Sequence, residues 1–267
     1  MVHSVSDVFG KFIQTMKVEK RTCEIHGDYE ASLIGLGDSR PACWSGCQEC
    51  VEEKNRLQFE EDARARAIES ARASLERKIG RASIPPRFAL KTFEDYRAET
   101  KEQQRALKTC KDYADKFEQY LGEGKSILLL GGVGTGKTHL ASSVANQIVR
   151  ETKYTAVYSA ASTIIRDVKA TFDRESQRSE SDVYRDYALP DLLIIDEVGV
   201  QNATEFELTV MFEVVNARYE AMIPTMVISN RGIGDLPKYL GDRVVDRLRE
   251  GGGKMVPFDW GSERART

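Results

Sequence analysis

The loop that decides the fold of this chain reads Gly131-Gly132-Val133-Gly134-Thr135-Gly136-Lys137-Thr138. It matches Gly-x-x-x-x-Gly-Lys-[Ser/Thr], the pattern of a phosphate-binding loop, at every fixed position. The apolar run Ser126–Leu130 before it predicts a buried strand, and residues 139–150, which hold neither Gly nor Pro, have the spacing of a helix. A strand, a glycine-rich loop and a helix in this order are the context that such a loop requires.

This loop has the chemistry to bind ATP. Its glycines let successive backbone N–H groups turn toward a phosphate chain, and the helix that follows adds the positive end of its dipole. We expect nucleotide contacts along Gly131–His139, with Lys137 on the β- and γ-phosphates and Thr138 binding Mg²⁺. His139 receives no chemistry of its own, because no cluster of partner side chains lies near it in sequence. A plain turn between a strand and a helix is the alternative, but the lysine and the hydroxyl in register favour the nucleotide site.

The composition is that of a globular protein without a membrane anchor. The chain has 267 residues, of which 41% are hydrophobic and 30% charged, enough for one large domain with an appendage or for two domains. Its net charge of −3 creates no field that would attract nucleic acid over the whole molecule, so any nucleic-acid site must be a local patch. No stretch approaches 18 apolar residues and no signal-peptide pattern is present, so we expect a cytoplasmic protein with no membrane partner.

Changes in composition predict three parts. Residues 1–52 hold four of the five cysteines, residues 53–82 read as a charged helical connector, and residues 83–267 alternate strand and helix. Pro85 and Pro86 are expected to end the connector helix. The alternation predicts an α/β fold whose parallel sheet is covered by helices on both faces. The five expected strands are Ser126–Leu130, Ala156–Ser159, Leu192–Asp196, Thr225–Ser229 and Met255–Phe258.

A second set of polar residues follows two of these strands. Asp196 and Glu197 end the apolar run Leu192–Ile195, and ligands of parallel sheets bind beyond the carboxyl ends of the strands. We expect Asp196 to bind Mg²⁺, directly or through water, and Glu197 to polarise the water that attacks the γ-phosphate. Asn230 ends the strand Thr225–Ser229 and would orient the same water, although Asn is also common in strand-end turns.

These elements resemble the Walker A, Walker B and sensor 1 motifs of an AAA+ P-loop ATPase. More narrowly, the chain from about residue 83 to residue 264 resembles the DnaC-type replicative helicase loaders of bacteria and phages, within a group that also includes IstB-like proteins. The Walker motifs are specific to the superfamily only, and other stretches narrow the resemblance. These stretches are Ile84-Pro85-Pro86-Arg87-Phe88, Thr92-Phe93, Gly136-Lys137-Thr138-His139-Leu140, Ser229-Asn230-Arg231, Gly241-Asp242-Arg243-Val244-Val245-Asp246-Arg247-Leu248-Arg249 and Phe258-Asp259-Trp260.

The resemblance implies an ATPase that assembles into an oligomer. In such proteins an arginine reaches the γ-phosphate of a neighbouring subunit, and the match gives this catalytic role to Arg247. Arg243, one helical turn earlier, is a rival for this role, and a plain surface ion pair is the alternative. Arg264 matches a nucleotide-sensing sensor 2 arginine by its distance from Trp260, although few residues follow it. The segment Ile84–Phe93 resembles the one that packs on adenine in this family.

The N-terminal part carries two candidate pairs of metal ligands, Cys23-x-x-His26 and Cys47-x-x-Cys50, separated by 20 residues. This spacing is typical of a structural zinc site, because a two-residue gap aims both side chains of a pair at one ion. Cys43 is a fifth candidate that could replace one ligand, and free thiols with a stray His are the alternative. A part of ~50 residues has a small core, so a metal would supply the missing stability. Cys110 stands alone in a predicted helix and is expected to be a buried small hydrophobe.

The resemblance implies a protein that delivers a ring-shaped replicative helicase to single-stranded DNA under the control of ATP. In some loaders a zinc module docks on the helicase, and this N-terminal part is similar in kind. Zinc modules also bind DNA, and the sequence does not decide between these two partners. Four alternatives remain: an IstB-like regulator of a transposase, an origin-binding initiator, a small-molecule kinase, and a zinc adaptor that only senses nucleotide. The Cys/His pairs argue against the IstB-like protein, and an initiator would need a DNA-binding helix-turn-helix after the ATPase. Asp196-Glu197 and Asn230 argue against the kinase.

Overall fold

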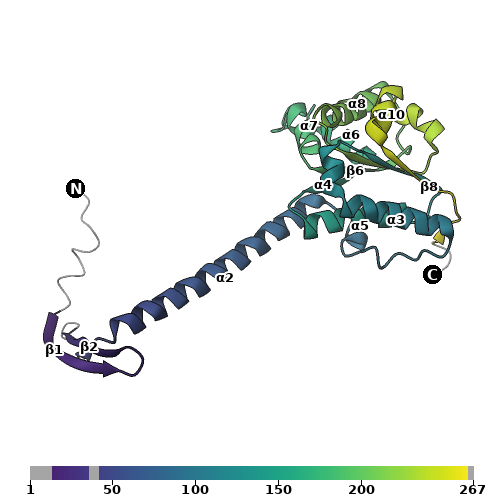
Figure 1. Cartoon of the computed structure of the whole chain (residues 1–267). Coiled ribbons are helices and arrows are strands. Elements are labelled where there is room, and N and C mark those ends of the chain that lie inside the picture. Colours follow the sequence, from purple (N-terminus) through teal and green to yellow (C-terminus); the bar gives the residue numbers. More distant parts are fainter. Residues whose placement is uncertain (1–13, 36–41, 264–267) are drawn as a thin grey trace. The chain divides into compact units, whose positions relative to one another are not determined.

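The structure of the chain is a computed structural model that describes residues 14–35 and 42–263. Its backbone contacts divide the chain into two compact units, Met1–Arg72 and Ala73–Thr267. Helix α2 (Gln48–Ala82) contributes residues to both units (Figure 1). Among the helices that the structure describes, none is both long and apolar enough to cross a membrane.

The N-terminal unit contains a small antiparallel sheet. Strands β1 (Gln14–Cys23) and β2 (Gly27–Gly35) form a hairpin, and the short strand β3 (Cys43–Trp44) pairs with β2. The hairpin turn consists of the residues between Cys23 and Gly27, and Gly27 has a φ of 80° that favours glycine. Of the first predicted ligand pair, Cys23 therefore ends β1 and His26 lies in the turn. The spacing of the ligands predicts a metal site in this part of the chain, but no pattern there predicts the strands.

Helix α2 begins earlier than the sequence indicated. The predicted connector started near residue 53, whereas the helix begins at Gln48, and the backbone N–H of Val51 donates to the Cys47 carbonyl at 3.0 Å. Cys50 therefore lies in the first helical turn. The helix ends at Ala82, as the prolines predicted, and Ser83 follows with a left-handed φ of 51°. The short 3₁₀ helix η1 (Pro86–Phe88) then leads into the second unit.

The second unit is built on a five-stranded, fully parallel sheet with the strand order β5-β6-β7-β4-β8. The strand bounds are β4 (Ile127–Gly131), β5 (Ala156–Ala160), β6 (Leu192–Val198), β7 (Thr225–Ser229) and β8 (Lys254–Phe258). All five predicted strands are therefore confirmed to within two residues at each end. Because the strands are parallel, the polar residues that follow β4, β6 and β7 meet at one edge of the sheet.

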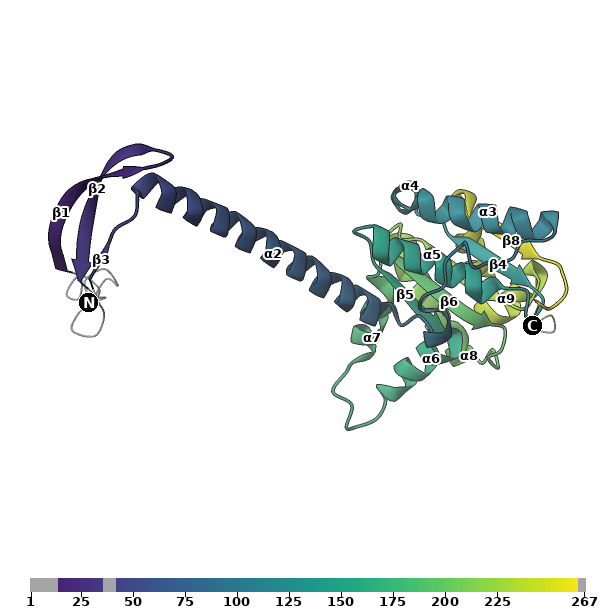
Figure 2. The same cartoon turned by 90° about the horizontal axis from the view of Figure 1, so that it is seen from below.

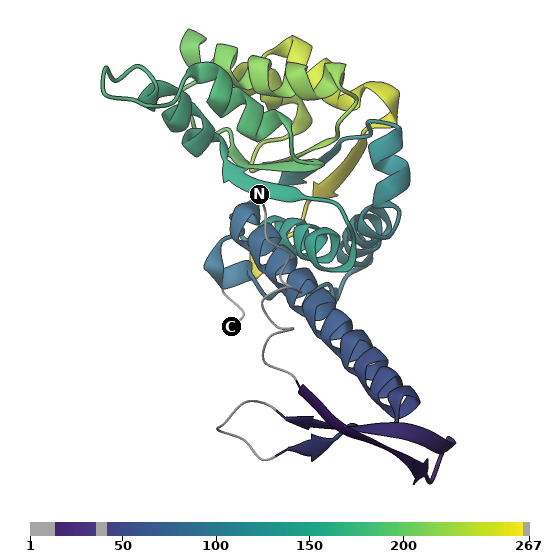
Figure 3. The ribbon, with the colours of Figure 1, turned by 90° about the vertical axis from the view of Figure 1, so that its left-hand side faces the viewer.

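Helices cover both faces of this sheet (Figure 3). One layer consists of α3 (Lys101–Asp115), α4 (Phe117–Gly122) and α5 (Lys137–Glu151), which are labelled beside β4 in Figure 2. The opposite layer consists of α6 (Ala161–Ala170), α7 (Glu180–Ala188), α8 (Glu205–Glu220), α9 (Leu236–Leu240) and α10 (Asp242–Arg249). The short 3₁₀ helices η2 (Ile233–Asp235) and η3 (Glu250–Gly252) flank α9 and α10. Capping boxes at the starts of α3, α7 and α8 satisfy the first backbone N–H groups of those helices.

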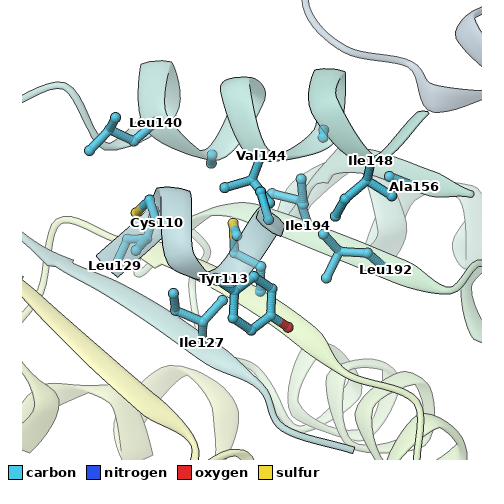
Figure 4. Close-up of a cluster of buried hydrophobic side chains, with 14 of the residues drawn as sticks. Cys110, Tyr113, Ile127, Leu129, Leu140, Val144, Ile148, Ala156, Leu192 and Ile194 are labelled. Atoms are coloured by element: carbon cyan, nitrogen blue, oxygen red, sulfur yellow. The ribbon is translucent and has the colours of Figure 1, made fainter. Parts of the chain in front are cut away.

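Alternate residues of the strands pack against opposite layers, as the two-residue period of a strand requires. Ile127 and Leu129 face α3 and α5, whereas Leu128 faces the opposite layer. Figure 4 shows the first of these two cores, in which helix residues lie over strand residues. Its labelled side chains are Cys110, Tyr113, Ile127, Leu129, Leu140, Val144, Ile148, Ala156, Leu192 and Ile194. Cys110 is fully buried there, which confirms its expected role as a small core residue.

A buried arginine fixes the loops at the amino ends of the strands. Arg218 of α8 is completely buried, and its guanidinium donates to the carbonyls of Tyr187, Ala188, Pro190, Asp191 and Pro224 and to the Thr225 hydroxyl. These partners lie before β6 and at the start of β7. A planar group with five N–H donors suits such a cluster of carbonyls, and the arginine thereby ties the end of α7 to the sheet.

Candidate functional site

The glycine-rich loop connects β4 to α5 and is shaped by two close backbone approaches. At Gly131 a Cβ atom would lie 2.3 Å from the Phe258 carbonyl oxygen, and at Gly136, with a φ of 91°, it would lie 2.6 Å from the Tyr96 ring. Neither position accepts a side chain without movement of its neighbours. The loop therefore keeps its backbone N–H groups near the amino end of α5, where the helix dipole favours a phosphate group.

Lys137 lies inside this loop. The side chain is 5% exposed, and its Nζ donates to the carbonyls of Gly131 at 2.8 Å and Gly132 at 2.5 Å. The same amino group lies 3.3 Å from the Thr135 hydroxyl. The lysine is thus held where a phosphate chain would contact the loop. Its position agrees with the role that the sequence predicts for it.

The two expected Mg²⁺ ligands lie side by side. Thr138, in the first turn of α5, donates through Oγ1 to Asp196 Oδ2 at the end of β6 over 3.1 Å. Asp196 is 8% exposed, and its Oδ1 accepts from the backbone N–H of Glu197 at 2.6 Å. A hydroxyl oxygen and a carboxylate are ligands that Mg²⁺ prefers. The residues present therefore fit this cation.

Tyr158 is a member of this cluster that the sequence analysis missed. Its hydroxyl donates to the same Asp196 Oδ2 that accepts from Thr138, and its side chain is 6% exposed. The tyrosine comes from β5, the strand next to β6 in the sheet. No motif contains it. Only the neighbouring positions of the two strands would have indicated the contact.

Glu197 faces the solvent beside this buried cluster. It has a left-handed φ of 59°, and the register between β6 and β7 shifts at this point. Such a backbone conformation costs about 1–3 kcal/mol in a residue other than glycine, and it turns the carboxylate out of the strand. Ser229 supports the bend, because its buried hydroxyl donates to the Val198 carbonyl at 2.5 Å. Val198 pairs with Ser229 on the neighbouring strand. Glu197, just before Val198, and Asn230, just after Ser229, therefore lie next to this pair, and both are exposed.

A cavity of about 590 Å³ borders these residues, and Phe88 of η1 lines it together with Thr138 and Glu197. The segment expected to pack on adenine therefore reaches the same cavity as the carboxylates. His139 lies behind the loop, with Nε2 at 3.1 Å from the Thr92 carbonyl and its ring against Tyr96 at 5.5 Å between centroids. Burial lowers the pKa of His139, so the ring is neutral and donates to that carbonyl.

Two aromatic residues hold the outer side of the glycine loop. Tyr96 donates through its hydroxyl to the Thr135 carbonyl at 3.3 Å, and Trp260 donates through its indole N–H to the same oxygen at 3.1 Å. The backbone N–H of Glu263 donates to the neighbouring Gly134 carbonyl at 2.9 Å. Segments from both ends of this unit therefore fix the loop. The family resemblance includes Trp260, but no sequence pattern indicates this contact.

The candidate arginines of α10 have different surroundings. The Arg247 guanidinium lies over the rings of Phe212 at 4.9 Å and Tyr219 at 5.2 Å, both from α8 of the same chain. Its Nη1 is buried and has no hydrogen-bond partner within the described part of the chain. Arg243 is exposed on the same helix. Arg264, the expected sensor 2 arginine, lies outside the described residues.

The N-terminal unit brings the four predicted metal ligands together. One ligand atom from each of Cys23, His26, Cys47 and Cys50 lies within 4.8 Å of the others. His26 Nδ1 is 3.8, 3.7 and 3.2 Å from the Sγ atoms of Cys23, Cys47 and Cys50, respectively. Four ligands about 2.3 Å from a central zinc ion would be roughly 3.8 Å apart, so this donor set fits zinc. Cys43, the fifth candidate, is exposed at β3 and does not belong to the cluster.

The cluster shows two features of a metal site. Backbone N–H groups of His26 and Ile25 lower the pKa of the Cys23 thiol to about 6, whereas hydrogen bonding to Cys23 raises that of Cys50 to about 11. Zinc binds the thiolate form, so binding of the metal here would release the protons that the cysteine thiols still carry. The second ring nitrogen of His26, Nε2, lies 3.7 Å from the Glu49 carboxylate. A carboxylate in this place typically orients a metal-bound histidine.

A larger cavity of about 800 Å³ lies at the amino end of β5, within the second unit. Its basic side chains are Arg77, Lys78 and Arg81 from the end of α2 and Arg178 before α7. Arg178 forms an ion pair with Asp186 at 2.5 Å, and Lys78 Nζ donates to the Thr152 carbonyl at 3.1 Å. Asp167 and Asp186 line the same cavity, but Arg77 and Arg81 are exposed and one helical turn apart, so their side of the rim is a local basic patch.

Comparisons with known proteins agree with this geometry. A family model described as IstB-like ATP binding protein matches residues 54–249. The replicative helicase loader DnaC of Escherichia coli (strain K12) is 34% identical over 199 residues, which are 74% of this chain and 79% of that protein. The protein of the same name from Buchnera aphidicola subsp. Schizaphis graminum is 30% identical over 213 residues, 80% and 83% of the two chains. A crystal structure of the DnaC helicase loader has a TM-score of 0.57 at 20% identity and covers 65% of this chain and 99% of its own.

Proposed function

The chain belongs to the family of IstB-like ATP-binding proteins, and we propose that within this family it works as a replicative helicase loader. The observation that carries the proposal is the similarity to proteins named replicative helicase loader over most of the chain. Membership in the family and the AAA+ type of fold confirm the resemblance inferred from the sequence. The same relatives favour a loader over a regulator of a transposase. A loader acts where DNA is replicated, so we place its function in the cytoplasm.

The chain is an AAA+ ATPase, and we propose a role for each group at the sheet edge. Lys137 would exchange loop carbonyls for the β- and γ-phosphates, as its place inside the loop supports. Thr138 and Asp196 would hold Mg²⁺, which neutralises charge on the phosphates when bound. Glu197 would polarise the attacking water, and Asn230 would orient it. The exposed, left-handed backbone position of Glu197 supports this assignment, because it separates this carboxylate from the buried Asp196.

We infer three further properties of the loader. The Cys23, His26, Cys47 and Cys50 cluster would hold one structural zinc ion, and residues 1–52 around it would form the docking module for the helicase. Residues 53–82 would act as the connector, and residues 83–267 as the ATPase domain. Single-stranded DNA would contact the basic rim formed by Arg77 and Arg81, which lie one helical turn apart and are exposed. Attraction between these arginines and phosphate groups would make DNA binding sensitive to salt.

The test of the loader function is reconstitution with the replicative helicase of the same cell. DNA coated with single-strand-binding protein should be unwound only when the helicase, this chain and ATP are all present. Lys137→Ala should bind the helicase without supporting unwinding, which makes it the matched control for the nucleotide. Arg77→Ala/Arg81→Ala should weaken DNA binding and flatten its dependence on salt. A chain that ignores the helicase and binds a transposase would instead act as the IstB-like regulator.

We propose that hydrolysis needs a neighbouring subunit, and the two arginines of α10 make this testable. The Arg247 guanidinium lies over two rings of its own chain, whereas Arg243 is exposed, so Arg247→Ala and Arg243→Ala are each tested. The variant that removes the arginine finger, whichever of the two it is, should lower turnover about 10³-fold and keep the affinity for ATP. Equal mixtures of that variant with Glu197→Gln should regain activity, because each subunit then supplies one intact half. Turnover that is independent of protein concentration, with no rescue in either mixture, would contradict the oligomer.

A further inference from the structure

The carboxylate of Asp196 is held from three sides by donors of this chain. Its Oδ1 accepts from the Glu197 backbone N–H at 2.6 Å, and its Oδ2 accepts from Thr138 Oγ1 at 3.1 Å and from the Tyr158 hydroxyl. A carboxylate accepts hydrogen bonds only, so both hydroxyl groups donate to it. Glu197 and Thr138 were expected at this site. Tyr158 belongs to no predicted motif.

The sheet register explains how a tyrosine from another strand reaches this carboxylate. Tyr158 of β5 is paired with Ile194 of β6, and Ala160 is paired with Asp196. Residues two apart on a strand point to the same face of the sheet, so Tyr158 and Asp196 share a face and are diagonal neighbours. A diagonal distance of this kind is within reach of an aromatic side chain but not of a short one. A small residue at Ala160 leaves the diagonal path between them open.

The three donors differ in what they can do once the nucleotide is bound. Thr138 is expected to offer its oxygen as a ligand to Mg²⁺, and the Glu197 N–H is fixed by the backbone at the bend of β6. The Tyr158 hydroxyl is the one side-chain donor among the three that is not itself an expected metal ligand. Its side chain is 6% exposed and packs in the core that also contains α5, so its ring has little freedom to move.

We propose that Tyr158 is a positioning residue for the Mg²⁺ site, acting through a hydrogen bond that fixes the orientation of the Asp196 carboxylate. This inference rests on the proposed hydrolysis site and adds a residue to it. A buried tyrosine also needs a partner for its hydroxyl, so a purely structural role is the competing explanation. The two explanations differ in one respect. A structural role changes stability, whereas a positioning role changes the dependence of nucleotide binding on Mg²⁺.

The experiment is a Mg²⁺ titration of Tyr158→Phe with a fluorescent ATP analogue, using binding rather than turnover as the main readout. The Mg²⁺ concentration at half-saturation should rise about tenfold, the scale expected for one hydrogen bond to a charged group. Nucleotide affinity in excess chelator should stay within about twofold, because the loop and Lys137 are unchanged. An unchanged Mg²⁺ titration in a folded Tyr158→Phe protein would overturn the proposal.

The chain offers a matched control. Tyr154 lies two residues before β5 and donates to the Glu118 carboxylate at 2.6 Å, away from the Asp196 cluster. Tyr154→Phe removes the same type of hydrogen bond and should titrate like the wild type. If the wild type itself binds nucleotide without any dependence on Mg²⁺, the proposed hydrolysis site fails. If nucleotide binding by the wild type depends on Mg²⁺ and Tyr158→Phe gives the same Mg²⁺ titration, only the role of Tyr158 is contradicted.

A second measurement does not depend on the folding of the tyrosine variant. Near-ultraviolet difference absorption between the wild type and Asp196→Asn should show the loss of one tyrosine–carboxylate hydrogen bond. Asparagine is a weaker acceptor than an ionised carboxylate, so the tyrosine band should shift to shorter wavelength. An identical spectrum in the two folded proteins would contradict the contact on which the proposal depends.

Discussion

Glu197→Gln is expected to keep ATP bound and to lower its hydrolysis by about 10²–10⁴-fold, the usual contribution of a general base. The substitution removes only the charge that polarises water, because Lys137, Thr138 and Asp196 stay in place. Glutamine has nearly the same shape, so the left-handed backbone at this position needs no further adjustment. Phosphate release should be measured beside equilibrium binding of a fluorescent ATP analogue.

Two controls separate hydrolysis from binding. Lys137→Ala should lose binding itself, since the phosphates then meet no amino group inside the loop. Glu205→Gln alters another exposed carboxylate, at the start of α8, and should leave both quantities unchanged. Wild-type turnover in Glu197→Gln would show that a different residue activates the water.

Removal of zinc is expected to unfold the N-terminal unit and to leave ATP binding intact. Structural zinc sites contribute about 10–16 kcal/mol to the folding of zinc-finger peptides, more than a small hairpin core can replace. Metal analysis of the purified chain should give about one equivalent, by the four-ligand rule. Cys47→Ser should lose the metal and the β-structure of this unit, as seen by circular dichroism.

Cys43→Ser is the matched control for this prediction, because Cys43 lies on β3, four residues before Cys47, but does not belong to the ligand set. It should retain the zinc. Protein purified without any chelator that contains less than about a tenth of an equivalent of zinc would contradict the four-ligand site. ATP binding that disappears together with the metal would show that the two units depend on each other.

The sequence was sufficient to predict the nucleotide-binding edge of the sheet. Lys137 and Asp196 are 59 positions apart, but parallel strands deliver their carboxyl ends to one place, so strand order along the chain already implied their meeting. The contacts of three other residues could not be predicted from the sequence: those of Tyr158, Tyr96 and Trp260. Each acts through one hydrogen bond between segments whose relative register no local pattern specifies.

The N-terminal unit shows a different limit. Ligand spacing identified the cysteine pairs, because tetrahedral coordination imposes its own short-range pattern. The hairpin that presents Cys23 and His26 was not predicted, since β1 and β2 are rich in charged residues and alternate weakly in hydrophobicity. Spacing alone also did not decide whether Cys43 is a zinc ligand. The pairing of β3 with β2 places its thiol away from the other three.

Trp260, whose indole donates to the glycine loop, gives the chain an optical consequence. The sequence contains two tryptophans, and they fall in different units. Trp44 lies in the N-terminal unit with the Arg21 guanidinium 4.1 Å from its ring, and Trp260 contacts the Thr135 carbonyl. Intrinsic fluorescence therefore divides into two local signals. We expect the emission of Trp44 to respond to the state of the metal-bearing unit and the emission of Trp260 to respond to nucleotide in the phosphate loop, without any attached dye.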